Sequence, residues 1–144
     1  MRPLFLLAVF SVAVMVTSCG GGMPTAGEGE PLPVGRLGQD AIAVRQRDYA
    51  FDAEDIRVSS GRVEFKVTNQ GSGPHELVVV PRDGDRFGLP VAEAGAQDPG
   101  ASSGLRVNLG PGHYSIVCLL VATPPEGPVS HMELGMRFDF EVSP

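Results

Sequence analysis

Histidine, cysteine and tryptophan are scarce in this chain, whose 144 residues include three histidines, two cysteines and no tryptophan. Three histidines supply few imidazole ligands, and this argues against a catalytic centre that needs a second histidine-bound metal ion. The two cysteines, Cys19 and Cys118, lie far apart, although exported proteins normally use cysteines in pairs. Basic residues are also few, 11 against 17 acidic ones, which argues against a nucleic-acid partner and favours a cationic one.

The chain has room for one hydrophobic core and short extra segments. Residues 1–18 combine a single basic residue with the apolar run Leu4 to Val16 and small residues before Cys19, which is typical of a secretory leader and not of a membrane-spanning helix. The ending Val16-Thr-Ser-Cys19 resembles a bacterial lipobox, in which the cysteine is lipidated and becomes the mature N-terminus. An ordinary signal peptide beside an incidental cysteine is the alternative. We expect Cys19 to anchor the protein outside the cytoplasm, on a bacterial membrane, in the periplasm or at the cell surface.

Residues 19–41 are predicted to be the lipidated cysteine and a flexible linker. The sequence from Gly20 to Asp40 is rich in turn-forming residues and has no hydrophobic periodicity. Removal of the leader takes away one arginine and no acid, so that the mature chain has 10 basic and 17 acidic groups and a net charge of −7. A disulfide between Cys19 and Cys118 is the other use of these cysteines, and it would leave the remaining candidate metal ligands unexplained.

Residues 42–144 show the alternation of β-strands, and no helical periodicity rivals it. Arg62 to Thr68 alternates strictly, with Val63, Phe65 and Val67 on one face, and Arg137 to Val142 repeats this pattern. Further strands are predicted at Ala43–Phe51, Ile56–Val58, His75–Val80, Leu105–Leu109 and His113–Cys118, and a long loop with one helical turn at Pro81–Ser103. About seven or eight short antiparallel strands predict an all-β fold, a Greek-key β-sandwich with its site loops at one end.

Four side chains that bind soft metal ions lie in the second half of the chain. His75 follows a Gly-Pro turn, and Cys118 ends a predicted strand on the face of Ile116. Twelve residues separate Cys118 from His131, which lies in the same loop as Met136. A thiolate, two imidazoles and a thioether are the donors of trigonal His₂Cys copper sites with a weak axial methionine. Taken singly, these residues are also explained as loop histidines and a buried cysteine. Their order and spacing together favour a copper site.

The domain resembles a cupredoxin, the blue-copper family of plastocyanin and azurin. The resemblance covers about residues 42–143 and is carried by three motifs: Asn69-Gln-Gly-Ser-Gly-Pro-His75, the strand Gly112 to Cys118, and His131 to Met136 followed by the last strand. It implies His75, Cys118 and His131 as ligands of one type 1 copper ion and Met136 as the axial ligand, with Met132 as the alternative. The gap of twelve residues between Cys118 and His131 is longer than in the small members of the family.

The resemblance also implies the function, which is electron transfer by a monomer and not enzymatic catalysis. We expect electrons to pass through His131, with an apolar rim of Leu119, Leu120, Val129, Met132 and Leu134 for brief docking of a redox partner. A cytochrome or a membrane-bound oxidase or reductase is the expected class of partner. Three alternatives remain: a copper carrier, which usually offers more Met and His; a metal-free interaction module; and a copper enzyme, which needs more histidines.

Four further residues are assigned from the pattern. His113 alternates with Tyr114 and is predicted to lie on the surface. Tyr49 and Phe51 are predicted to be core aromatics. Asn69 is predicted to satisfy backbone groups of the loop before His75 and to steady that side of the site.

Overall fold

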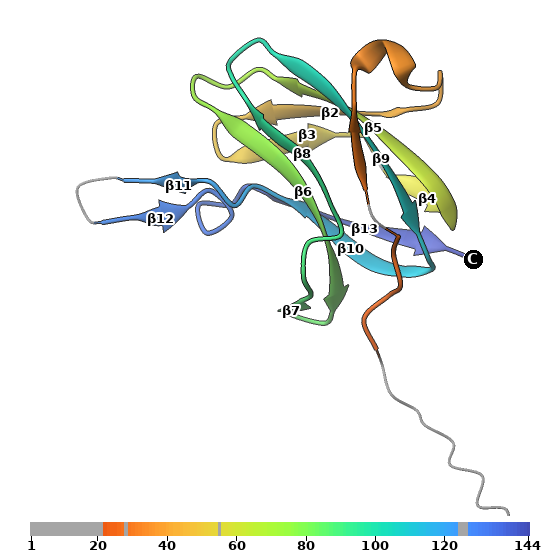
Figure 1. The fold of residues 1–144 in the computed structure, drawn as a ribbon. Coiled ribbons are helices and arrows are strands. Elements are labelled where there is room, and N and C mark those ends of the chain that lie inside the picture. The colour runs from red at the N-terminus through yellow and green to blue at the C-terminus, as the bar shows by residue number, and fades with distance from the viewer. Residues whose placement is uncertain (1–21, 28, 55, 124–126) are drawn as a thin grey trace, which may run out of the picture.

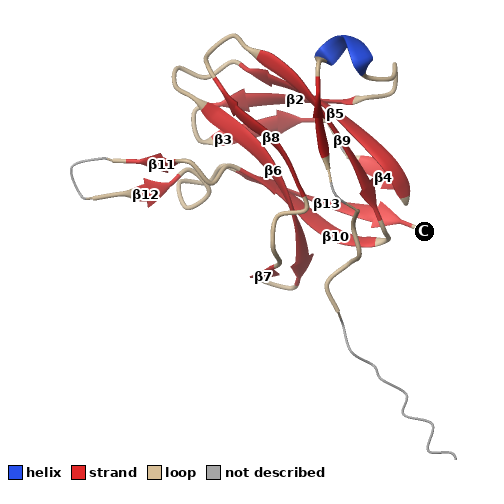
Figure 2. Cartoon of the chain, viewed as in Figure 1, coloured by secondary structure: helices blue, strands red, loops and turns tan. Residues whose placement is uncertain are grey.

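A computed structural model describes residues 22–27, 29–54, 56–123 and 127–144. Its regular structure is almost entirely strand, with one short 3₁₀ helix, η1 (Val34–Arg36), among the described residues (Figure 2). The strands are β1 (Glu30–Leu32), β2 (Ile42–Arg47), β3 (Ala50–Ala53), β4 (Arg57–Ser59), β5 (Gly61–Asn69), β6 (His75–Asp83), β7 (Arg86–Phe87), β8 (Ala92–Gln97), β9 (Ser102–Leu109), β10 (Gly112–Val117), β11 (Val121–Ala122), β12 (Val129–Ser130) and β13 (Arg137–Ser143). The predicted all-β class is confirmed.

The strands form a sandwich of two sheets, from which the β11–β12 hairpin projects (Figure 1). One sheet has the order β1-β9-β5-β2-β3; the other has the order β4-β13-β10-β6-β7, with β8 also paired to β6. The alternation predicted for β5 is confirmed, because Val63, Phe65 and Val67 are buried in the core between the sheets. On the facing sheet Tyr114 and Ile116 of β10 point into the same core. The core is therefore built from the period-two positions of both sheets.

The register of the second sheet brings one end of three strands together. β10 is antiparallel to both β6 and β13, with Val117 opposite Val78 and Arg137. The end of β10 therefore lies beside the beginnings of β6 and β13. His75 is the first residue of β6, Cys118 directly follows β10 and Met136 directly precedes β13. Three candidate ligands that are far apart in the sequence thus reach the same edge of one sheet.

Two predicted segments differ from the structure. Ala43–Phe51 is not one strand but the hairpin of β2 and β3, which reverses through Asp48 and Tyr49. Tyr49 has φ +60°, a left-handed conformation that few non-glycine residues adopt, so the sequence carried no turn signal. Pro81–Ser103 is not a loop with a helical turn, because β7 and β8 both pair with β6. The small residues of β8 gave no strand signal, and its conformation depends on pairing with a neighbour.

Much of the predicted linker at residues 19–41 is packed against the domain. Glu30–Leu32 form β1 and pair with β9, and Leu32 is buried. Closer to the N-terminus, the Gly27 amide donates to the Asn108 carbonyl at 2.8 Å. We call residues 22–32, without the undescribed residue 28, the N-terminal strap. Cys19 and the predicted leader lie outside the described residues, and no helix in the described part is long and apolar enough to cross a membrane.

Candidate metal centre

Three potential ligand atoms converge at the edge of the sandwich where β6 begins and β10 ends. The ring nitrogens of His75 and His131 and the sulfur of Cys118 all lie within 4.8 Å of one another. The two Nδ1 atoms are 3.1 Å apart, and the Cys118 Sγ lies 3.4 Å from the His131 Nδ1. All three side chains are buried. Among the described residues this is the one group of three or more His, Cys, Asp or Glu side chains with such spacing.

His75 owes its position to β6 and to the loop that precedes it. Asn69, the last residue of β5, is fully buried and donates from its side-chain amide to the carbonyls of Gly73 and Gln97, both at 2.8 Å. Its Oδ1 accepts a hydrogen bond from the Gly71 amide at 2.9 Å. The Asn69 side chain therefore satisfies backbone groups of the loop, as predicted, and these hydrogen bonds fix the conformation of the loop that leads to His75.

Cys118 is a free, fully buried thiol at the end of β10. Its sulfur lies 3.5 Å from the backbone amide of Glu76, which points at it as a donor. Burial raises the pKa of the Cys118 thiol, and hydrogen bonds from the backbone offset only part of this effect. A thiol of this kind is a poor nucleophile, and binding of a metal ion requires its proton to leave.

The long segment between Cys118 and His131 is a hairpin closed at its base by hydrogen bonds. The His131 amide donates to the Leu120 carbonyl at 2.8 Å, and the Met132 amide donates to the Cys118 carbonyl at 2.9 Å. β11 and β12 extend the same antiparallel pairing outward (Figure 1). The separation of Cys118 and His131 is therefore set at the base of the hairpin and does not depend on how many residues its outer part contains.

Met136 and Met132 lie on different sides of the β6–β10 sheet. Met136 is fully buried in the same apolar cluster as Cys118, and its carbonyl accepts a hydrogen bond from the Cys118 amide at 3.2 Å. Met132 packs instead against Val78, Val80 and Val117. Because Val117 and Cys118 are successive residues, their side chains point to opposite faces. Of the two methionines, only Met136 therefore lies on the thiol's face.

His131 is buried and lies against the turn between β2 and β3. Its side chain is 7% exposed, and the ring of Tyr49 meets it edge-on with ring centroids 5.1 Å apart. Burial, and next the neighbouring His75, lower the pKa of His131, so that its imidazole is neutral and has a free lone pair at neutral pH. The expectation that Tyr49 is a core residue is wrong, because it is 42% exposed at the hairpin tip. Phe51 is buried and His113 is exposed, as predicted.

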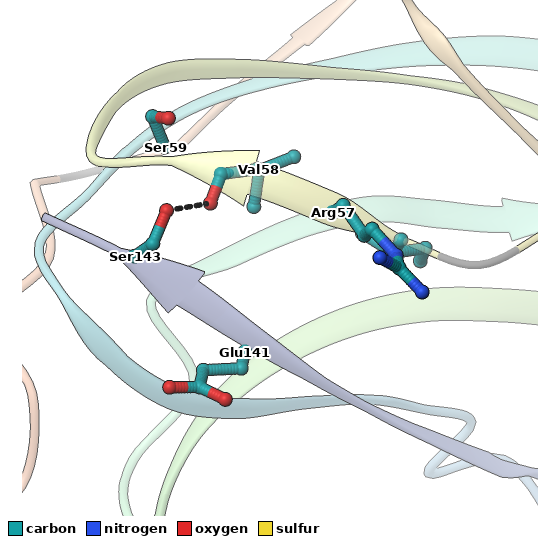
Figure 3. A pocket seen from close by; sticks show the side chains of 6 residues that line it. Arg57, Val58, Ser59, Glu141 and Ser143 are labelled. Carbon is teal, nitrogen blue, oxygen red and sulfur yellow. Dashed lines mark hydrogen bonds between the residues drawn. The ribbon is translucent and has the colours of Figure 1, made fainter.

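A cavity of about 420 Å³ reaches both imidazoles from the surface and is lined by Asp48, Tyr49, Ser72, Gly73, Pro74, His75, Leu120, Val121, Ala122 and His131. A second cavity, of about 450 Å³, lies where β4 pairs with β13 (Figure 3). It is lined by Arg57, Glu141 and small or apolar side chains, beside the hydrogen bond from the Ser143 hydroxyl to the Val58 carbonyl. This second cavity contains no histidine or cysteine and does not reach the converging ligand atoms.

Solved structures of similar shape identify the fold. An auracyanin from the photosynthetic bacterium Roseiflexus castenholzii superposes with a TM-score of 0.52 at 19% identity, over 71% of this chain and 95% of that one. Auracyanin B superposes with a TM-score of 0.58 at 18% identity, over 79% of this chain and 98% of that one. The protein has the cupredoxin fold. No protein-family model matches the sequence, and no curated protein matches it significantly.

The donor atoms of this domain with the cupredoxin fold fit a single type 1 copper ion. Two imidazoles and one thiol converge, and the thioether-bearing Met136 lies beside the thiol in the core. This is the combination of one soft sulfur and two nitrogens, with a second sulfur nearby, that copper sites of this type use. The sequence gave no sign of two contacts to the histidines, from Asp48 and Tyr49, because both come from the turn that was taken for the middle of a strand.

Proposed function

We propose that the protein is an electron-transfer protein with one type 1 copper ion, held by His75, Cys118 and His131 with Met136 as the axial ligand. The observation that carries the proposal is the convergence of two ring nitrogens and one sulfur within 4.8 Å in a buried site. Bound copper would supply a one-electron couple between Cu(I) and Cu(II). Soft sulfur donors favour the reduced ion, and the imidazoles suit both oxidation states.

The protein contributes rigidity and a dry environment to this chemistry. Cys118 and His75 adjoin the paired strands β10 and β6. The His131 amide donates a hydrogen bond to the Leu120 carbonyl, and the Met136 carbonyl accepts one from the Cys118 amide. The Met136 amide donates to the His131 carbonyl at 2.9 Å, which closes the loop between the two residues. A donor set that hardly moves between oxidation states keeps the cost of reorganisation small. The Glu76 amide directed at the Cys118 sulfur would stabilise negative charge on the thiolate.

A redox partner would dock on the apolar side chains around the base of the hairpin. Leu119, Val121 and Leu134 are 42%, 60% and 42% exposed, and Leu120 and Val121 line the cavity that leads to His131. Tyr49 is exposed beside the same ring. Such a small apolar surface suits a brief contact with fast release. We propose a cytochrome or a membrane-bound oxidase or reductase as the partner, met by a monomer of this protein.

The domain would act outside the cytoplasm, attached to a bacterial membrane by lipid on Cys19. The support for this is the leader and the lipobox-like ending at residues 16–19 of the sequence. The N-terminal strap shortens the flexible tether that the sequence predicts, because the packed part of the chain begins only a few residues after Cys19 in the sequence. Pro24 lies against the start of β10, where a side chain at Gly112 would come within 2.5 Å of it. The proposed linker is therefore shorter than the segment of residues 19–41 that the sequence predicts.

The test is copper binding by residues 20–144, a chain that retains all described residues. With one equivalent of Cu(II) we expect an intense visible band from thiolate-to-copper charge transfer and a copper resonance with narrow hyperfine splitting. Cys118→Ser should abolish the band. His113→Gln is the matched control for loose copper binding, because His113 is exposed and far along β10 from Cys118, and it should leave the spectrum unchanged.

Three outcomes would contradict the proposal. A colourless protein that binds Cu(I) tightly would indicate a copper carrier, and a protein that binds neither ion would indicate a metal-free interaction module. A band of equal intensity in Cys118→Ser would show that copper sits elsewhere.

A further inference from the structure

The tip of the β2–β3 hairpin contacts both histidines of the candidate centre. Asp48 and Tyr49 are the two residues of this turn. The Asp48 Oδ1 lies 3.3 Å from the Nε2 of His75, and the Tyr49 ring packs edge-on against His131. Tyr49 adopts φ +60°, a conformation that is rare for a residue with a side chain. Strained turns of this kind persist where the surrounding structure fixes them, often at functional sites.

Asp48 is held in place by the loop that precedes His75. The Ser72 amide donates to Asp48 Oδ1 at 2.7 Å, and the Ser72 hydroxyl donates to Oδ2 at 2.8 Å. The carboxylate side chain is 48% exposed, but both of its oxygens are engaged. Asp48 therefore bridges Ser72 and His75 from the turn between β2 and β3.

Gly71 makes the contact between Asp48 and His75 possible. A Cβ atom at this position would lie 2.6 Å from the His75 Nε2 and 2.7 Å from the Asp48 Oδ1, closer than side-chain atoms approach. Any other residue at position 71 would thus push apart the two atoms that face each other. The glycine is required by this close approach and not by an unusual backbone angle.

We propose that Asp48 is a positioning residue that fixes the tautomer of His75 for metal binding. The proposal rests on the proposed function, because it assigns a task at the same site. A carboxylate accepts hydrogen bonds, so His75 carries its proton on Nε2 and donates it to Asp48. Its Nδ1 then presents a lone pair toward Cys118 and His131, where the donors converge. In other metalloproteins such carboxylate–histidine pairs fix the ring and raise its basicity.

The expected consequence is a preference for the oxidised ion. A more basic imidazole and a nearby negative charge both stabilise Cu(II) more than Cu(I). Asp48 thereby lowers the reduction potential of the site. Because the carboxylate contacts the side of the ring that faces the cavity, it acts on the metal through His75 and not as a ligand.

The experiment compares Asp48→Asn, Gly71→Ala and Asp52→Asn with the parent chain of residues 20–144. Asp48→Asn removes the charge; Gly71→Ala keeps the charge but separates the two side chains. Asp52→Asn is the matched control, because it removes the same charge from the same hairpin, where Asp52 pairs with Arg47 at 3.2 Å. We expect the first two variants to lower Cu(II) affinity by roughly 10–100-fold. With Cu(I) affinity unchanged, the potential rises by about 59 mV for each factor of ten. The control should change it little.

A second measurement needs no metal. Nitrogen-15 shifts of the His75 ring in the metal-free parent should report a proton on Nε2, and both site variants should show a mixture of tautomers. A proton on Nδ1 of the parent would overturn the proposal. So would equal potential shifts in Asp48→Asn and Asp52→Asn with no change in Gly71→Ala, because net charge alone would then explain them. If the parent forms no blue copper site, the proposed function fails, and the tautomer still decides the role of Asp48.

Discussion

At the scale of single residues, the positions of the two methionines near His131 decide which of them can act as the axial ligand. Met132 and Met136 are close in sequence, and either could reach a metal bound to His131. The fold directs Met136 into the core beside Cys118 and packs Met132 against Val78, Val80 and Val117 on the other face of the sheet. A thioether can act as the axial donor only from the face on which the thiolate lies.

We therefore predict that Met136→Leu retains the thiolate band and raises the reduction potential. The leucine keeps the apolar volume of this fully buried position, while loss of the sulfur lone pair removes a donor that stabilises Cu(II) more than Cu(I). A tenfold change in relative affinity corresponds to about 59 mV. Cyclic voltammetry measures the shift. Met132→Leu is the matched control, and a larger shift in that variant would reverse the assignment.

At the scale of structural elements, the N-terminal strap protects an edge of the sandwich. β1 pairs with β9, which without it would be the edge strand of the five-stranded sheet. The strap also supplies the Thr25 carbonyl, which accepts a hydrogen bond from the buried Tyr114 hydroxyl at 3.0 Å. Loss of the strap would leave backbone groups of β9 unpaired and expose an edge to association.

Leu32 is the one buried residue among the described residues of the strap. We predict that Leu32→Ala lowers the free energy of unfolding by about 2–3 kcal/mol. Its side chain is 7% exposed in the native structure, so the substitution removes buried methyl groups. Urea unfolding followed by circular dichroism measures the change. Leu89→Ala is the control, because Leu89 is 84% exposed and the same substitution should cost less than about 0.5 kcal/mol. Equal effects in the two variants would mean that the strap does not contribute to stability.

At the scale of the whole molecule, Pro24 of the strap and the candidate metal centre lie at opposite ends of β10. Pro24 of the strap lies against Gly112, where β10 begins, and Cys118 follows its last residue. Six residues of extended strand span ~20 Å. With lipid on Cys19, the centre would face away from the membrane. The partner would then present its redox group in the aqueous phase.

The acidic surface should steer small redox reagents by their charge. The mature chain has a predicted net charge of −7, and interactions between exposed charges weaken as the Debye length shortens from ~30 Å at 0.01 M salt to ~8 Å at 0.15 M. We predict that oxidation of the Cu(I) protein by a cationic metal complex slows by roughly tenfold over this range. Stopped-flow absorption measures the rate. An anionic complex of similar potential is the control and should react faster with added salt; the same salt dependence for both would contradict charge steering.

The sequence was informative where a residue's chemistry or period decides its role. The alternation in β5 predicted which of its side chains fill the core. The donor types of four side chains predicted a copper site: the fold brings His75, Cys118 and His131 together and places Met136 in the same apolar cluster as Cys118. It failed at the Asp48–Tyr49 turn, where a left-handed tyrosine takes the place of the glycine or asparagine that normally signals a hairpin. It also failed at β1, a three-residue strand in a segment rich in Gly and Pro, and at β8, which consists of small and polar residues. Both segments become strands only by pairing, β1 with β9 and β8 with β6.

What the sequence by itself determined is the set of donors, the all-β class and the net charge, because these follow from residue types and from the two-residue period of a strand. What only the tertiary structure decided is which methionine faces the thiol, how far the predicted linker is packed, and that Asp48 meets His75. These depend on register and on which face each side chain takes, and a strand's pairing partners are chosen by contacts between residues that are distant in the chain.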